Sequence, residues 1–312
     1  MSTSIPKFKL NTGAQIPAIG LGTWQSKPGE VQRAVEHAIE VGYRHIDAAY
    51  CYDNEDEVGK GLKAALASGK VKREDIFVTT KLWCTYHTRV EQNLDLSLKA
   101  LGLEYVDLYL LHWPVAMNPN GNDERFPKHP DGSRDVTAER SHVDTYKDME
   151  RLVATGKTKA IGVANYSVRY LEELLPKASI VPAVNQIENH PLLPQQEIVD
   201  FCSNKGIHVT AYSPLGSSGG PLLQLPAIQR LAEKKSASPA AVLLSWHVSN
   251  GRSVLAKSVT PSRIEENLNL VDLDESDLQE IDDVIETCKR TTGFTRYVYP
   301  PFGVDFGFLD KS

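Results

Sequence analysis

Residues 42–55 read GYRHIDAAYCYDNE and, with the residues that follow, predict one strand–helix unit. The short segment His45–Ile46 predicts a buried strand that leads to Asp47. From Glu55 to Ala67 apolar residues recur at helical spacing, which predicts an amphipathic helix. Strands that alternate with such helices are typical of a parallel sheet, so the sequence predicts an α/β fold.

The same alternation continues along the whole chain. The predicted strands are Ala18–Leu21, His45–Ile46, Ile76–Thr80, Val106–Leu111, Thr158–Val163, Ala183–Ile187, His208–Tyr212 and Val254–Ala256. The predicted helices are Pro28–Glu40, Glu55–Ala67, Arg89–Leu101, Asp144–Ala154, Ser167–Leu175, Gln195–Asn204, Ala227–Lys235, Pro239–Ser249, Pro261–Leu270 and Glu275–Cys288. Two of these helices follow the seventh strand and two follow the eighth, so we expect two helices beyond a simple alternation.

Eight parallel strands are the number that closes a (β/α)8 TIM barrel, which typically needs about 250 residues. The competing fold is a doubly wound open sheet, whose dinucleotide fingerprint should stand in the first strand–helix turn. That turn reads Gly20-Leu21-Gly22-Thr23-Trp24-Gln25, which lacks the third glycine. We therefore predict the barrel, preceded by a β-hairpin over Phe8–Ile16.

No low-complexity tract or proline-rich linker divides the 312 residues, so we expect one domain over residues 1–312. Two segments lack a regular pattern, Val115–Ser141 and Thr291–Ser312. Loops this long are usually functional. The first would follow strand four on the C-terminal face of the barrel, where active sites lie. We expect the tail, residues 289–312, to close over the same face.

Composition argues against several classes of partner. The formal net charge of -6 disfavours a nucleic-acid or membrane-surface protein, and an anionic ligand would need a local basic site. The N-terminus, Met1–Lys9, is polar, and no apolar run approaches the ~20 residues of a membrane span. We expect a cytoplasmic monomer with reduced thiols, because no C-x-x-C pair joins the four cysteines, Cys51, Cys84, Cys202 and Cys288.

Four side chains with catalytic potential follow strands of the predicted barrel. Asp47, Lys81 and His112 stand at strand ends, and Tyr52 lies in the loop after Asp47. Strand ends of a barrel point into one funnel, so residues distant in sequence can meet there. Each residue taken alone has an ordinary structural explanation, such as a helix cap for Asp47. Tyr50 is an alternative to Tyr52 as the catalytic tyrosine. The four together, in register with eight strands, favour a catalytic group.

These residue types suit the reduction of a carbonyl, which needs a hydride at carbon and a proton at oxygen. A phenol has a pKa of about 10, and a neighbouring ammonium can lower it by roughly 1–3 pH units. We predict Tyr52 as the acid, Lys81 as the group that tunes it, Asp47 as the anchor of Lys81, and His112 as the group that orients the carbonyl. Short-chain dehydrogenases also use a Tyr acid, but they carry Tyr and Lys on one helix. Tyr52 and Lys81 belong to different predicted elements, which argues against that class.

Metal and serine-hydrolase chemistry have little support in the sequence. The chain has no H-E-x-x-H motif or Cys/His ligand spacing, so we predict no metal site. A G-x-S-x-G nucleophile elbow is absent too.

A second signature follows the eighth strand. Residues 256–267 read AKSVTPSRIEEN and open a predicted helix, where barrels often bind phosphate. Its two cations, Lys257 and Arg263, can hold a further phosphate, although a surface helix with ordinary charges would look the same.

Together these residues resemble the aldo-keto reductase family, from about Phe8 to Cys288. The group Asp47, Tyr52, Lys81 and His112 is similar to the family's catalytic tetrad, and residues 256–267 resemble its I-P-K-S-x-x-x-x-R-x-x-E-N motif. Three further segments match, GVANY at 162–166, NQIE at 185–188 and YSPLGS at 212–217. The departures are Ala48, Ala164 and Ala256, where the family commonly has Thr, Ser and Pro.

The resemblance implies NADP(H) as the cofactor. In the family, residues that match Lys257, Ser258 and Arg263 hold the 2′-phosphate, and those that match Glu266 and Asn267 contact the adenine. The other implied cofactor residues are Asn165 and Gln186 for the carboxamide, Tyr212 for stacking on the nicotinamide, Leu215 and Ser217 for the pyrophosphate loop, and Thr23, Asp47, Ser213, Val259 and Thr260.

The resemblance also implies a pocket for a small carbonyl or polyol. Trp24, Trp83 and Trp113 match family positions at the pocket mouth, and we expect them to contact substrate with Tyr52 and His112. The tail resembles that of fungal NADP-dependent glycerol dehydrogenases and glyceraldehyde reductases, which implies glycerol, glyceraldehyde or a related sugar as substrate. Sugar aldehydes or uronates are the alternative substrates, and a non-catalytic NADP-binding regulatory subunit of the same fold is the alternative function.

Overall fold

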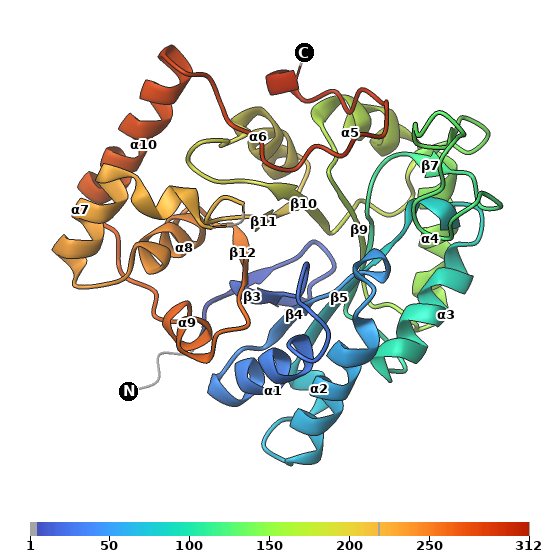
Figure 1. Ribbon diagram of the computed structural model, residues 1–312, viewed down its shortest axis with the longest axis horizontal. Coiled ribbons are helices and arrows are strands. Elements are labelled where there is room, and N and C mark those ends of the chain that lie inside the picture. The colour runs from blue at the N-terminus through green and yellow to red at the C-terminus, as the bar shows by residue number, and fades with distance from the viewer. Residues whose placement is uncertain (1–4, 218, 312) are drawn as a thin grey trace.

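The computed structural model describes residues 5–217 and 219–311. The first four residues of the polar N-terminus and the last residue of the tail lie outside the described residues. Eight parallel strands close into a barrel in chain order, which confirms the predicted (β/α)8 fold (Figure 1). They are β3 (Ile19–Gly22), β4 (His45–Asp47), β5 (Phe77–Leu82), β6 (Leu108–Leu111), β9 (Ile161–Ala164), β10 (Val184–Glu188), β11 (His208–Tyr212) and β12 (Ser253–Lys257).

Helices surround the barrel, and each turns an apolar face toward it. In α1, for example, Val31, Ala34, Val35, Ala38 and Ile39 are buried on one side. The two extra helices are present, because α7 and α8 both follow β11 and α9 and α10 both follow β12. The helices are α1 (Val31–Val41), α2 (Glu55–Ala67), α3 (Val90–Leu101), α4 (His142–Ala154), α5 (Val168–Leu174), α6 (Gln196–Asn204), α7 (Pro226–Lys235), α8 (Pro239–Ser249), α9 (Pro261–Glu266) and α10 (Glu275–Arg290).

Several predicted boundaries differ from the structure by up to three residues, and the largest difference, four residues, is at the first helix after β12. The helix expected over Pro261–Leu270 ends at Glu266, because the N–H groups of Leu268 and Asn269 bond three residues back in tight turns. The chain can then turn toward α10.

The predicted N-terminal hairpin is also present, with β1 (Lys7–Lys9) paired antiparallel to β2 (Gln15–Pro17). Leu10 and Ile16 pack with Phe77, Leu108 and Val184, which begin or lie near the start of their strands. The hairpin therefore covers the N-terminal end of the barrel and leaves the C-terminal end open.

Gly20, in the segment that resembles part of a dinucleotide fingerprint, has a packing role instead. A Cβ on Gly20 would lie 2.7 Å from Leu255 Cδ2 and 2.8 Å from the ring of His45. Such contacts are too short, so the glycine permits close packing between strands of the barrel.

The long loop after β6 contains a two-stranded sheet that the sequence pattern did not predict. Here β7 (Ala116–Met117) pairs antiparallel with β8 (Val136–Thr137), and Asn118 Nδ2 donates to Asp135 Oδ2 at 2.9 Å beside it. Strands of two residues are too short for a visible periodicity. The pairing folds the loop back on itself over the C-terminal end of the barrel.

Candidate active site

The carboxylate of Asp47 and the ammonium of Lys81 lie at the centre of the site. Asp47 ends β4, and Lys81 lies in the neighbouring strand β5. Lys81 Nζ lies 2.6 Å from Asp47 Oδ1, 2.9 Å from the carbonyl oxygen of Ala48 and 3.2 Å from the hydroxyl of Tyr52. These acceptors use all three N–H donors of the buried ammonium.

The contact with Lys81 decides which of two tyrosines can act as the acid. The Tyr52 oxygen accepts from Lys81, so its own O–H is free to donate. Tyr50 points elsewhere, because its hydroxyl donates to Glu124 Oε1 at 2.6 Å and lies 3.2 Å from the hydroxyl of Tyr86. The geometry therefore favours Tyr52.

Burial governs the acidity of Tyr52. Removal from water, and then the negative charge of Asp47, hold the pKa of the Tyr52 phenol well above its usual value. This direction is opposite to the lowering that we predicted from the neighbouring ammonium. Asp47 offsets the charge of Lys81, while burial disfavours the phenolate. Tyr52 is therefore protonated at neutral pH, as a group that gives a proton to a carbonyl oxygen must be.

His112 follows β6 and faces Tyr52, with the two ring centroids 5.7 Å apart. Burial, and then the charge of Lys81, hold the pKa of His112 well below its usual value, so its imidazole is neutral. Its Nδ1 lies 3.5 Å from the sulfur of Cys51, a contact that sequence reasoning missed. Burial raises the pKa of the Cys51 thiol, so the sulfur keeps a proton to donate to Nδ1. In the tautomer whose Nδ1 accepts from the thiol, the imidazole proton lies on Nε2, where it can donate to a substrate.

Replacing Cys51 by Val should lower turnover by about two- to tenfold, because one neutral hydrogen bond that orients His112 is lost. Steady-state kinetics at saturating cofactor would measure the change. The control is Cys84→Ala, since Cys84 is a second free thiol that has no hydrogen bond to His112. Equal turnover in wild type and Cys51→Val would contradict an orienting role for the thiol.

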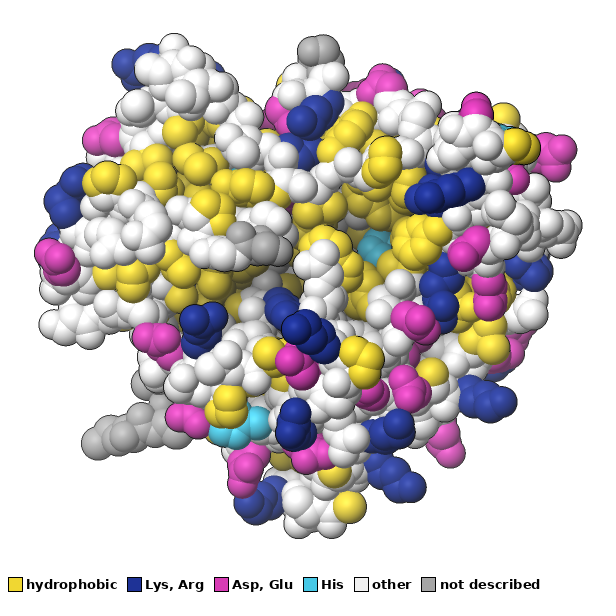
Figure 2. All heavy atoms as spheres, viewed as in Figure 1, with side chains coloured by type: hydrophobic (Ala, Val, Ile, Leu, Met, Phe, Trp, Pro, Cys, Tyr) yellow, Lys and Arg dark blue, Asp and Glu magenta, His cyan; other side chains and the backbone are white. Residues whose placement is uncertain are grey.

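Aromatic side chains wall the site beside His112. Trp83 and Trp113 are buried, and the Trp83 ring lies 5.3 Å from that of His112. Phe302, from the tail, packs edge-on against both tryptophans at 6.3 and 5.9 Å. Figure 2 shows a hollow with largely hydrophobic walls, a histidine on its floor and Lys or Arg side chains at its rim. Trp24 is 44% exposed and has no ring contact with the other tryptophans.

Three residues implied for the carboxamide and nicotinamide meet beside Asp47. Gln186 Nε2 donates to Asp47 Oδ2 at 2.7 Å, and Asn165 Nδ2 donates to the carbonyl oxygen of His112 at 2.9 Å. The Tyr212 hydroxyl donates to Asn165 Oδ1 at 2.7 Å. The Asn165 and Gln186 carbonyl oxygens retain acceptor capacity, which suits the NH₂ group of a carboxamide.

The residues implied for the cofactor's other end lie on the loops after β11 and β12. Lys257 and Arg263 are exposed, and within the described ranges neither side chain has a hydrogen bond or ion pair. Ser258 is buried between them, and its hydroxyl accepts from Thr260 N at 3.1 Å. Two unpaired cations beside a hydroxyl suit a phosphate monoester. The hydroxyl of Thr23, another implied cofactor residue, donates to the carbonyl oxygen of Asp47. The remaining implied residues follow β11 (Ser213, Leu215 and Ser217) and β12 (Val259, Glu266 and Asn267).

Comparison with known proteins assigns this arrangement to a family. The model of the "Aldo/keto reductase family" matches residues 18–286. The chain belongs to this family. It is 63% identical to D-galacturonate reductase of Hypocrea jecorina, over 98% of each chain, and 48% identical to glycerol 2-dehydrogenase (NADP(+)) of Saccharomyces cerevisiae, over 95% of this chain and 96% of the relative. The aldose reductase of Schistosoma japonicum superposes with a TM-score of 0.85 at 42% identity, covering 89% of this chain and 92% of that one.

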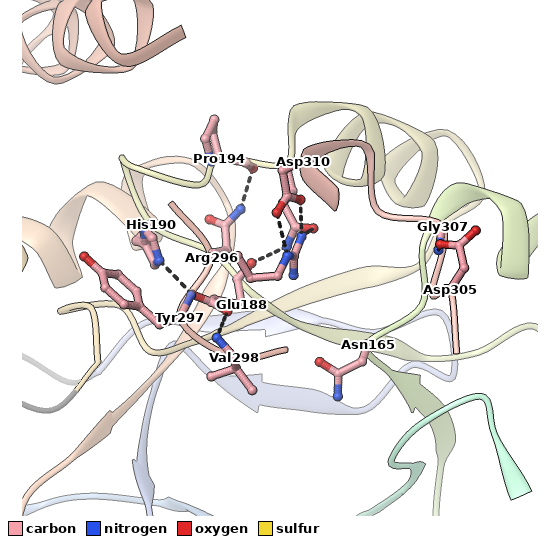
Figure 3. Close-up of polar contacts among 12 residues, drawn as sticks. Asn165, Glu188, His190, Pro194, Arg296, Tyr297, Val298, Asp305, Gly307 and Asp310 are labelled. Atoms are coloured by element: carbon pink, nitrogen blue, oxygen red, sulfur yellow. Dashed lines mark hydrogen bonds and ion pairs between the residues drawn. The ribbon is translucent and has the colours of Figure 1, made fainter. Parts of the chain in front are cut away.

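In this aldo-keto reductase, buried charges anchor the tail to the barrel (Figure 3). Arg296 forms a bidentate ion pair with Asp310, at 2.6 and 2.9 Å, and its Nη2 also donates to Gln195 Oε1 at 2.6 Å. The Glu188 carboxylate, at the end of β10, accepts the N–H groups of Tyr297 and of the next residue at 2.7 and 2.8 Å. The tail is thus anchored at the C-terminal end of β10.

The aromatic side chains of the tail have different neighbours. Phe302 and Phe306 pack against Trp113, whereas Tyr297 lies beside His190 and Tyr299 beside Phe306. Phe302 and Phe306 are therefore the tail aromatics whose rings contact the tryptophans.

Removing the carboxylate by Asp310→Ala should loosen the tail and raise the KM for substrate. The substitution leaves the Arg296 guanidinium, which is 1% exposed, without its anion. We expect this to lower the free energy of unfolding by about 3 kcal/mol. Hydrogen exchange of residues 296–311 and the KM for substrate would measure the effect. Asp305→Ala is the control, because the Arg169–Asp305 pair is exposed and screened by solvent, so its loss should change stability little. Equal exchange in the two variants would contradict the anchoring role.

In residues 5–217 and 219–311, no three His, Cys, Asp or Glu side chains gather where they could hold a metal ion. No helix in that part of the chain has the length and apolar character needed to cross a membrane.

Proposed function

We propose that this enzyme reduces the aldehyde group of small sugar-derived substrates with NADPH, and that a uronate such as galacturonate is its leading substrate. The observation that carries the proposal is the contact chain Asp47–Lys81–Tyr52 beside His112. The relative named D-galacturonate reductase supports the uronate, at 63% identity. A second candidate pair, glycerol and glyceraldehyde, is favoured by the relative named glycerol 2-dehydrogenase (NADP(+)).

The side chains can divide the work as follows. When bound, NADPH supplies the hydride. The protonated Tyr52 donates its proton to the carbonyl oxygen, a contribution of roughly 10²–10⁴-fold for a well-placed acid. His112 donates from Nε2 to the same oxygen and orients it. Lys81, held by Asp47, stabilises the negative charge that then develops on Tyr52, and its burial strengthens that interaction.

The cofactor proposal rests on the two ends of its site. Asn165 and Gln186 offer acceptors for the carboxamide, and Lys257, Ser258 and Arg263 offer two cations and a hydroxyl for the 2′-phosphate. The extra phosphate is the reason to propose NADP(H) over NAD(H). We also propose a cytoplasmic monomer that acts as one domain, in keeping with the four free thiols.

A non-catalytic regulatory subunit is no longer a competitive alternative. The named reductases and dehydrogenases match this chain at 48–63% identity over nearly their full length, so the chain is an enzyme.

A substrate panel tests the proposal directly. NADPH oxidation would be followed with D-galacturonate, glyceraldehyde and D-galactose, and NADP⁺ reduction with glycerol. We expect the highest kcat/KM with galacturonate. Absence of NADPH-dependent reduction with every aldehyde would overturn the proposed function, whereas preference for glyceraldehyde would move it to the second candidate.

A further inference from the structure

A uronate differs from a neutral sugar by a carboxylate at the opposite end of the carbon chain from its aldehyde. The protein carries a formal net charge of -6, so its overall field repels this anion. Tight recognition therefore needs a cation near the mouth of the pocket that no protein carboxylate already neutralises.

Most arginines at this end of the barrel are already paired. Arg125 bonds to Asp53 at 2.7 Å, Arg169 to Asp305 at 2.7 Å, and Arg296 to Asp310 at 2.6 Å. These guanidinium groups have anionic partners within the protein and are poor candidates for a substrate carboxylate.

Arg134, in the long loop after β6, is different. Within the described residues it has no ion pair, its Nη1 donates to the carbonyl oxygen of Phe126, and its Nε is buried without a hydrogen bond. The acidic residue nearby in the loop, Asp123, uses its Oδ1 to accept the N–H groups of Arg125 and Phe126. Within the described residues, no carboxylate lies at ion-pair distance from Arg134. Its charge acts on Asp123 only at longer range, where it adds to the backbone N–H groups of Phe126 and Arg125 and the charge of Arg125 in lowering the pKa of that carboxyl.

Ring contacts connect Arg134 to the reacting end of the pocket. Its Cζ lies 5.2 Å from the centre of the Phe126 ring and 5.8 Å from that of Phe302. Both rings pack edge-on against Trp83, at 5.2 and 6.3 Å, and the Trp83 ring lies 5.3 Å from His112. The rings of Phe126, Phe302 and Trp83 therefore connect Arg134 to His112 in a continuous series of contacts.

The loop that carries Arg134 is held to this wall. Trp83 Nε1 donates to the carbonyl oxygen of Arg125 at 2.6 Å, and the Arg134 guanidinium stacks on rings from both the loop and the tail. Nη1 keeps a second N–H, and Nη2 has no hydrogen bond within the described residues, so the edge between these two nitrogens keeps donors for a carboxylate.

From these contacts we infer that Arg134 is the specificity-determining residue that binds the carboxylate of a uronate while its aldehyde lies at Tyr52 and His112. This inference rests on the proposed function and assigns a residue to its substrate class. A neutral aldehyde would be reduced at the same site without this contact.

The test compares D-galacturonate with D-galactose, which differ at the carboxylate. Arg134→Met keeps an unbranched side chain over the rings and removes the charge. We expect the ratio of kcat/KM for galacturonate to that for galactose to fall by about 10- to 100-fold, the loss of a charge-assisted contact. Arg134→Lys, which keeps the charge without the planar fork, should show a smaller fall. Arg125→Met is the matched control, with a positive charge removed from the same loop.

Each outcome bears on the inference. A fall in the ratio with Arg134→Met and not with Arg125→Met supports it. An equal fall in both variants would mean that the general charge of the loop acts, and a parallel loss on both sugars would mean a structural role; either overturns it. A wild-type enzyme that reduces glyceraldehyde but not galacturonate also overturns it and leaves aldehyde reduction standing. Reduction of no aldehyde would overturn the proposed function as well.

Discussion

Turnover in the Tyr52→Phe variant should fall by at least about 10²–10⁴-fold, the usual contribution of a positioned general acid. The substitution removes the one hydroxyl that Lys81 contacts and that has a free proton. The aromatic ring stays, so its packing against His112 should persist. Lys81 loses one of three acceptors, and we therefore expect a modest fall in melting temperature. Steady-state reduction of glyceraldehyde and fluorescence titration with NADPH would separate chemistry from binding.

Tyr50→Phe is the matched control for this experiment. It removes the hydroxyl of the rival tyrosine, which contacts Glu124 and Tyr86 rather than Lys81. We expect its turnover to stay far above that of Tyr52→Phe. Wild-type turnover in Tyr52→Phe would sink the assignment of the acid.

Removing both unpaired cations, in Lys257→Ala/Arg263→Ala, should weaken NADPH binding by at least about 100-fold and NADH binding far less. Each charge-assisted contact is worth about 1.5–3 kcal/mol, so two contribute about 3–6 kcal/mol. Only NADPH carries the extra phosphate that these groups would hold. Titration of both cofactors against the variant, at fixed ionic strength, would measure the difference.

The control for this pair is Lys63→Ala/Lys99→Ala. Both lysines are exposed and have no hydrogen bond or ion pair in the part of the chain that the structure describes, but they lie on α2 and α3, away from α9. The control should leave both affinities close to wild type. An equal loss of NADPH and NADH affinity in the Lys257/Arg263 variant would place the phosphate elsewhere.

Much of the fold was readable from local pattern. A buried parallel strand needs a short apolar run and an amphipathic helix needs helical spacing, and both signals are written in adjacent residues. Prediction failed where that local signal is weak. The two-residue strands β7 and β8 have no periodicity to read, and α9 ends four residues early through tight turns that the pattern beyond Glu266 does not reveal.

The sequence by itself determined the order of the strands and helices, the barrel that eight such units close, and which residue types stand at the strand ends. Only the tertiary structure decided how those residues meet. It places the hydroxyl of Tyr52, and not that of Tyr50, 3.2 Å from Lys81 Nζ, and burial sets the pKa of Tyr52 above its usual value. Within the described residues it also leaves Arg134 without an ion pair, whereas Arg125 is paired with Asp53. Hydrogen bonds, burial and ion pairs depend on distances between segments far apart in the chain, and local sequence does not encode those distances.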